Sequence, residues 1–241
     1  MLEQYSRGQR KQIEQYFRCL SYICTDGMIS YYYLAFDFQK KDRFIRNHYM
    51  KKILKRWHIT DITSLKKELS WLLEDQHREH YLRLHKQLTA LPWEARQRYV
   101  KGFENEADYR KLAVVNRMIP ELPSGDISAF STAWMILLCQ IGEAHDLLSK
   151  EEAWKLKLKA AEYAHQAYSS WPEYIIGFTA GSYFMLNDGK FQKNGFLARQ
   201  AVTISNGKNP LIKRFPWGMN LYPDNGKFAS TEQSVATSTY V

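Results

Sequence analysis

The sequence has few cysteines and no long apolar run. Its three cysteines, Cys19, Cys24 and Cys139, form no CxxC pair and no Cys/His cluster with the spacing of a zinc site, so we expect no disulfide scaffold. The first residues lack the apolar core of a signal peptide, and the longest apolar stretches are shorter than the ~18 residues needed to cross a bilayer. We therefore expect a soluble protein of the reducing cytoplasm, without a membrane span.

The sequence also lacks the motifs that identify common enzymes. It has no GxSxG elbow, no Walker A loop, no GxGxxG after a strand, no EF-hand loop and no HExxH pair. From these absences we predict no cofactor and no metal site, and we favour a function other than catalysis.

Enough apolar material is present to build a core. Of 241 residues, 45% are hydrophobic, 15% aromatic and 24% charged, which excludes disorder throughout the chain. The aromatic residues are spread evenly, and we therefore predict a single domain over residues 1–228. Residues 206–228, rich in glycine and proline, are expected to wrap this domain as irregular chain, and the polar segment 229–241 is expected to be disordered.

Helical periodicity dominates the chain. Nearly every position from 127 to 143 is apolar, which predicts a central helix buried on most sides. Asp61 is placed to cap a helix whose apolar pattern continues without interruption to Leu88, and the aromatic segment 30–38 is read as helical because helices are expected on both sides. The fold class is therefore all-α: one multi-helix globular domain around helix 127–143.

Two further helix starts and a pair of glycines support this prediction. Ser149 with Glu152, and Ser170 with Glu173, match the capping box, in which each side chain bonds an otherwise unpaired backbone N–H. Gly177 and Gly181 lie four residues apart on one helical face, where the absence of side chains lets another backbone approach closely.

The positive charge is concentrated in the first half. The net charge is +9, and residues 1–120 hold 23 basic and 14 acidic side chains, so the whole excess lies there. The densest stretch runs from Lys40 to Arg56 with Asp42 as its one acid, and its apolar residues repeat at helical spacing on one side. The face expected to bind a partner carries Arg46, Lys51, Lys52, Lys55 and Arg56.

Such a face attracts acidic proteins, phosphates or acidic lipid headgroups. An ordinary solvated helix face is the simplest alternative. The aromatic residues of this stretch fall on the apolar side of the helix, where they do not stack on bases, so nucleic acid is the least expected partner.

Candidate catalytic residues gather around His77. His77, His80 and His85 share one segment. Glu74, Asp75 and Glu79 are near His77 in sequence, a combination that suits acid–base chemistry. The alternative to a non-catalytic protein-interaction module is thus a hydrolase acting on a phosphate-containing substrate through His77 with Glu74 or Glu79. A nucleic-acid binder is the third option.

Several landmarks recur together in one known family. They are Trp57-His58-Ile59, Leu65, Trp71-Leu72, His77, the segment Leu148 to Trp154, Ser169-Ser170-Trp171, Gly181, Pro210 and Pro216-Trp217. In order and spacing this set resembles the bacterial family named domain of unknown function 1266 (YbeU/YbeR-like), over residues 45–217. The function of that family is not established, so the resemblance implies no activity.

The sequence departs from the family pattern at its polar positions. A W-D-x-x-R cluster of the family corresponds here to Phe130, Ser131 and Trp134, and a family arginine beside Gly181 corresponds to Ser182. The resemblance therefore implies that any charge-dependent site of the family is degenerate in this chain.

Overall fold

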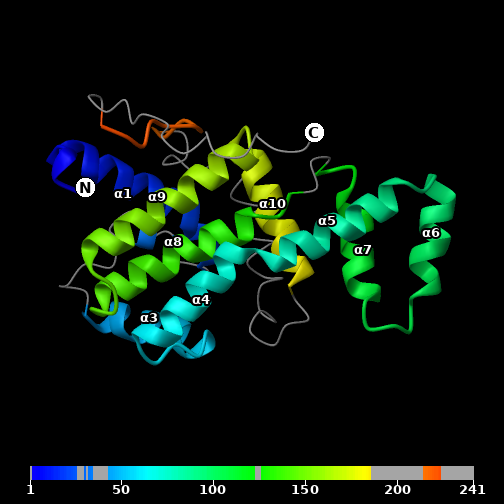
Figure 1. The fold of residues 1–241 in the computed structure, drawn as a ribbon, viewed down its shortest axis with the longest axis horizontal. Helices are drawn as coiled ribbons and strands as arrows, with labels where there is room; N and C mark the ends of the chain where they lie inside the picture. Colours follow the sequence, from blue (N-terminus) through cyan, green and yellow to red (C-terminus); the bar gives the residue numbers. More distant parts are fainter. Residues whose placement is uncertain are drawn as a thin grey trace, which may run out of the picture.

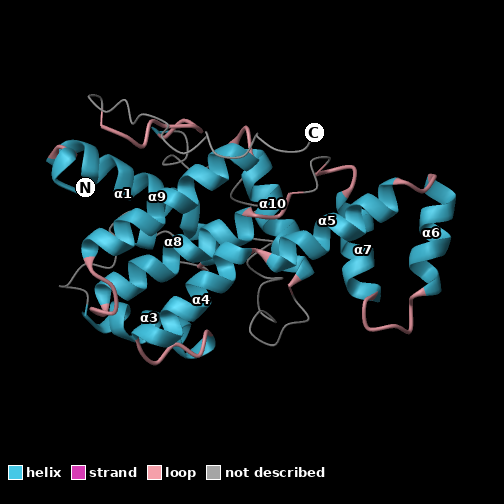
Figure 2. Cartoon of the chain, in the orientation of Figure 1, coloured by secondary structure: helices cyan, strands magenta, loops and turns pink. Residues whose placement is uncertain are grey.

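The computed structural model describes residues 2–25, 30, 32–34, 43–122, 126–185 and 214–223, without the side chains of Arg43, Ile45 and Arg46. Within these ranges the ordered elements are helices and no residue is in a strand (Figure 2). The chain is all-α, as its periodicity predicts. The helices are η1 (Leu2–Gln4), α1 (Arg7–Ser21), η2 (Tyr22–Cys24), α3 (Arg43–Arg56), α4 (Ile62–Glu74), α5 (Gln76–Thr89), α6 (Trp93–Gly102), α7 (Tyr109–Met118), α8 (Ala129–Ala144), α9 (Lys150–Ala167) and α10 (Trp171–Phe184).

Helix α8 lies at the centre of the molecule. Helices α1, α4, α9 and α10 all pack against it (Figure 1). From Ala129 to Cys139 every residue of α8 is buried, because the segment is apolar on all sides and finds a neighbour in each direction. The predicted central helix 127–143 is confirmed, with bounds shifted by one or two residues.

Helix α10 approaches α8 through its glycines. A Cβ atom at Gly181 would lie 2.7 Å from Cβ of Phe130 and 3.1 Å from the carbonyl oxygen of Ile127. A Cβ atom at Gly177 would lie 2.5 Å from the hydroxyl of Tyr168. At Gly181 the missing side chain therefore allows the close approach of another backbone that the sequence predicts, whereas at Gly177 it makes room for the side chain of Tyr168.

The predicted uninterrupted helix from Asp61 to Leu88 is wrong, because the chain breaks at Asp75. Asp61 caps α4 as expected, accepting a hydrogen bond from the Ser64 backbone N–H at 2.8 Å. Asp75, however, adopts the left-handed conformation with φ 51° and ψ 35°, which ends α4 and starts α5. The apolar pattern continues across the break, so periodicity alone gave no sign of it.

The helices after Asp75 carry the chain away from the core. Helix α5 leads to α6 and α7, which stand at one end of the molecule (Figure 1). Helix α7 returns to pack on α5 and α10. The prediction of one domain over residues 1–228 stays a prediction.

A short C-terminal segment docks beside α9 and α10. The indole of Trp171 donates to the carbonyl of Phe215 at 2.8 Å, and that of Trp217 donates to the carbonyl of Tyr168 at 2.9 Å. Of the predicted irregular wrap, residues 206–213 and 224–228 lie outside the described residues, as does the tail 229–241.

Of the aromatic segment 30–38, residues 30 and 32–34 are helical, and the others lie outside the described part of the chain. None of the described helices has the length and apolar character required to traverse a bilayer.

Candidate functional site

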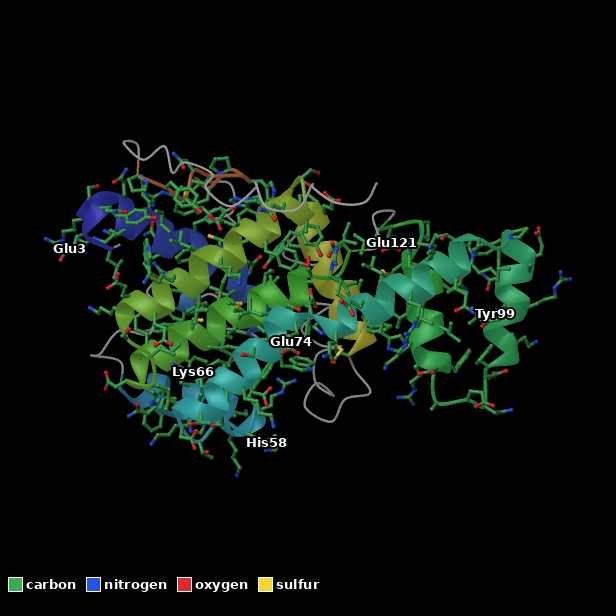
Figure 3. The ribbon with its side chains drawn as sticks, viewed as in Figure 1. Glu3, His58, Lys66, Glu74, Tyr99 and Glu121 are labelled. Atoms are coloured by element: carbon green, nitrogen blue, oxygen red, sulfur yellow. The ribbon has the colours of Figure 1, made fainter. Side chains whose placement is uncertain are left out.

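The basic face expected from the sequence lies on α3. Lys51, Lys52 and Lys55 are all exposed there, and the helix contains no acidic residue. No ion pair joins these three lysines to an acid in the part of the chain that the structure describes. His58, labelled in Figure 3, lies two residues after the end of this helix.

Two arginines of the predicted face are placed differently. The guanidinium of Arg56 lies over the ring of Trp134, 5.9 Å from its centroid, so this side chain is half-buried against α8. The side chain of Arg46 lies outside the described residues. Three lysines therefore carry the described charge of the face.

A shallow hollow adjoins the lysines. It is lined by Phe44, Asn47, His48 and Lys51. The ring of Phe44 is 86% exposed and stacks on His48 with a centroid distance of 6.3 Å. An apolar ring thus stands in water beside a run of cations.

A second polar cluster lies buried where the α4–α5 junction meets α8. The hydroxyl of Ser131 donates to Oδ1 of Asp75 at 2.7 Å and lies 2.9 Å from Nε2 of His77. The same Nε2 lies 3.0 Å from Oδ1 of Asp75. The left-handed turn at Asp75 makes this meeting possible, because it starts a new helix and turns His77 toward α8 together with the carboxylate.

His77 is neutral in this environment. Its ring stacks on Trp71 at a centroid distance of 5.1 Å and meets the edge of Phe130 at 5.4 Å. Burial among these rings lowers the pKa of His77 to about 4. Glu74 and Glu79, the predicted partners of His77, have exposed side chains, and Glu74 accepts a hydrogen bond from Gln76 instead.

Asp75 is the unusual acid of the cluster. Burial raises the pKa of Asp75 to about 6, against the opposing effects of the Ser131 hydrogen bond and the Arg78 charge. Its second oxygen, Oδ2, is buried and has no hydrogen-bond partner among the described residues. A carboxylate in this position is costly because no cation among the described residues bonds it directly, although the charge of Arg78 lowers its pKa in part.

The cluster does not have the geometry of a serine-hydrolase relay. In such a relay the serine and the acid contact opposite nitrogens of the histidine. Here both Ser131 and Asp75 contact Nε2, and Nδ1 has no partner among the described residues. The serine proton is directed to Asp75, so His77 is not positioned to act as its base.

A neighbouring ion pair fixes the start of α8. The guanidinium of Arg78 donates to Oδ2 of Asp126 from Nε at 3.1 Å and from Nη2 at 2.8 Å. Oδ1 of Asp126 accepts from the Ser128 backbone N–H at 2.7 Å, and the Tyr168 hydroxyl donates to the Asp126 carbonyl at 2.9 Å. Although burial acts in the opposite direction, the hydrogen bonds from Arg78 and Ser128 hold the pKa of Asp126 below its usual value.

A groove opens beside the buried cluster. It has a volume of about 360 Å³ and lies between α4, α8 and α9. Its apolar wall includes Leu72, Met135 and Ala160, and its polar end includes Ser131 and Tyr163. Ser131 therefore connects the groove to Asp75 and His77.

The other histidines of this segment point elsewhere. His80 meets the edge of Phe184, and His85 stacks on Tyr81. Among the residues described, no three His, Cys, Asp or Glu side chains come together in a way that would hold a metal ion.

Sequence reasoning named Asp75, with Glu74 and Glu79, as a possible partner of His77, and Asp75 is the one of the three that contacts it. It missed Ser131 and Asp126. Ser131 was singled out only as the position of a family acid. No local pattern connects it with Asp75, because 56 residues separate them and periodicity describes one helix at a time.

Comparison with known proteins gives one match. The model of a protein family described as "Protein of unknown function (DUF1266)" matches residues 52–217. No curated protein and no solved structure matches the chain.

Proposed function

Because the chain belongs to the DUF1266 family, for which no activity is given, we propose from its own surface that it is a protein-interaction module that binds an acidic partner. The observation that carries this proposal is the α3 face, on which Lys51, Lys52 and Lys55 are exposed and unpaired within the described residues. Lys55 lies three residues after Lys52 and four after Lys51, so it is a neighbour of both on the helix surface and joins them into one patch.

The electrostatics of this patch suit an acidic protein. The field of the exposed ammonium groups extends about 8 Å into solvent at physiological salt. It speeds the approach of an acidic surface and selects against basic ones. The exposed ring of Phe44 adds an apolar contact of the kind that anchors protein interfaces.

The proposal also includes the location of the protein, which we place in the cytoplasm of a bacterium. The three cysteines are free and buried, which is typical of a protein from a reducing compartment.

A photo-crosslinking experiment tests the proposed interface. A photoreactive amino acid replaces Lys52 in one variant and Lys101 of α6, which is equally exposed, in a control. Irradiation of cells expressing each variant should trap an acidic protein at position 52 and not at position 101. Crosslinks to nucleic acid at position 52 would instead favour the third option.

Charge reversal then tests affinity with the purified partner. The variant K51E/K52E/K55E should bind roughly 10- to 100-fold more weakly, since three favourable contacts become repulsive. The control K86E/R98E/K101E makes the same change of net charge on exposed positions of α5 and α6 and should bind as the unmodified protein does. Equal losses in both variants would contradict the proposal.

A hydrolase acting on a phosphate-containing substrate is the second candidate. It is supported by the place of Ser131 in the lining of the groove, but not by the contact between Ser131 and His77, because the serine proton is directed to Asp75. The negative charge of Asp75 and Glu162 argues against this candidate, because carboxylates repel phosphate. Turnover of p-nitrophenyl phosphate that disappears in Ser131→Ala would support this candidate.

A further inference from the structure

The groove between α4, α8 and α9 is shaped for a small, elongated molecule. Its volume is about 360 Å³. Lys159, Tyr163 and Gln166 follow one another along α9 and line it over roughly 10 Å at ~1.5 Å per residue. Since α8 packs against α9, Met135 of α8 completes an apolar stretch within it.

A carboxylate lies behind the polar end of the groove. Asp75 is 5% exposed and accepts the hydrogen bond of Ser131, while the guanidinium of Arg78 lies 5.9 Å from the centre of the Tyr163 ring. The Asp75 charge also reaches Tyr163, whose pKa is raised first by burial and then by this carboxylate. Two residues that line the polar end, Ser131 and Tyr163, therefore both face Asp75.

No cation of the described residues neutralises Asp75 directly. His77 is uncharged at neutral pH, because burial lowers the pKa of His77 to about 4. The guanidinium of Arg78 gives both of its hydrogen bonds to Asp126. A buried carboxylate without a direct cationic partner is unfavourable, so a positively charged group that enters the groove gains by approaching it.

Glu162 supplies the carboxylate of the groove lining itself. Burial raises the pKa of Glu162, as expected for an acid that lacks a compensating cation. The one cation of the described lining is Lys159, whose side chain is exposed. The Ser131 hydroxyl gives its proton to Asp75 and keeps a lone pair with which to accept a hydrogen bond.

We propose that this groove binds a small primary amine that carries an apolar body. The ammonium group lies beside Ser131 and Glu162, where it neutralises Asp75, and the apolar body lies against Leu72 and Met135. This site uses helices other than α3, so it is independent of the proposed protein interface.

Binding of simple amines to the full-length protein tests the proposal. Hexylamine should bind with a Kd of ~1 mM or below, which matches the affinity expected for a ligand of this size. Hexanoate and 1-hexanol have the same apolar body but no ammonium group, and each should bind at least about tenfold more weakly. Calorimetry gives the affinities, and shifts of backbone amide resonances of α8 and α9 identify the groove.

Two substitutions at the edge of the groove keep the test independent of folding. Glu162→Gln removes a carboxylate from the lining and should weaken hexylamine binding by about tenfold. Leu73→Lys introduces a cation at an exposed position of the lining and should weaken it at least as much. Glu94→Gln makes the same change as Glu162→Gln on an exposed residue of α6 and should leave binding unchanged.

Three results would overturn the proposal. One is hexanoate or hexanol binding as tightly as hexylamine. Another is the absence of amine binding up to ~10 mM, where a ligand of this size with a matching site is detectable. The third is equal affinity in Glu162→Gln and Glu94→Gln, which would place the amine outside the groove.

Discussion

Alanine at Gly181 should destabilise the protein through one specific clash. The added Cβ would lie 2.7 Å from Cβ of Phe130 and 3.1 Å from the carbonyl oxygen of Ile127. Both atoms belong to the backbone or are attached directly to it, so a rotamer change cannot relieve the contact. Helix α10 must therefore move away from α8, against which it packs.

The expected magnitude follows from two opposing effects. Alanine in a helix is favoured over glycine by about 1 kcal/mol. Overpacking a buried contact costs typically 1–3 kcal/mol, about the upper end where the clash involves backbone. We expect the free energy of unfolding to fall by about 1–2 kcal/mol and the melting temperature by roughly 2–8 °C.

Thermal and urea unfolding measure this change, with Gly102→Ala as the matched control. A Cβ atom at Gly102, at the end of α6, meets nothing within 4 Å. The same substitution there should raise the free energy of unfolding by about 0.5–1 kcal/mol, because alanine restricts the unfolded chain more than glycine does. Equal or greater stability of Gly181→Ala would refute the close approach of α10 to α8.

Three further predictions concern buried polar contacts. Lys157 is fully buried and donates a hydrogen bond to Glu14 at 2.7 Å. Lys157→Met should therefore lower the free energy of unfolding, measured by urea titration, by about 2–4 kcal/mol. A loss below about 1 kcal/mol would contradict the stabilising role of this pair. Trp217→Phe removes the hydrogen bond to the Tyr168 carbonyl and should lower the free energy of unfolding by about 1 kcal/mol in the same assay. An unchanged midpoint of urea unfolding would show that the docked C-terminal segment does not stabilise the fold. The pKa values of about 6 for Asp75 and about 4 for His77 predict opposite pH dependences of stability. As pH falls below 6, folded Asp75 binds a proton more readily than unfolded Asp75, so the fold gains stability. As pH falls below 6.5, the unfolded histidine binds a proton before buried His77 does, so the fold loses stability. The two effects cancel between about pH 4 and 6 in the unmodified protein. As pH falls through this range, Asp75→Asn should lose about 1.4 kcal/mol of stability per pH unit, and His77→Gln should gain the same amount. Stability that does not change with pH in either variant would refute the two pKa shifts.

Much of the fold follows from local physical chemistry. Helix periodicity and the side-chain caps at Ser6, Asp61, Ser149 and Ser170 depend on residues within one or two turns, and the structure has a helix beginning after each of them. The central position of α8 was also predictable, because a segment that is apolar all round has no stable place at a surface. The one-sided charge is a property of composition.

The candidate sites depend on information that is not local. Ser131 meets Asp75 and His77 across 56 and 54 residues, and Arg78 meets Asp126 across 48. Which side chains face one another there depends on how far each helix is rotated and on where α4 ends. The left-handed conformation of Asp75 changes both the rotation of the helices and the end of α4, and the spacing of apolar residues on either side of it gives no sign of this change.

The sequence by itself determined which segments are helical, which of them is buried on all sides, and where the excess positive charge lies, because these properties arise within single segments. Only the tertiary structure decided that Asp75 interrupts a continuous apolar pattern, that Arg56 packs on Trp134 instead of facing solvent, and that a buried carboxylate lies behind the groove. The physical reason is that the free energy of a buried polar group depends on partners supplied by other helices, whose relative placement no single segment encodes.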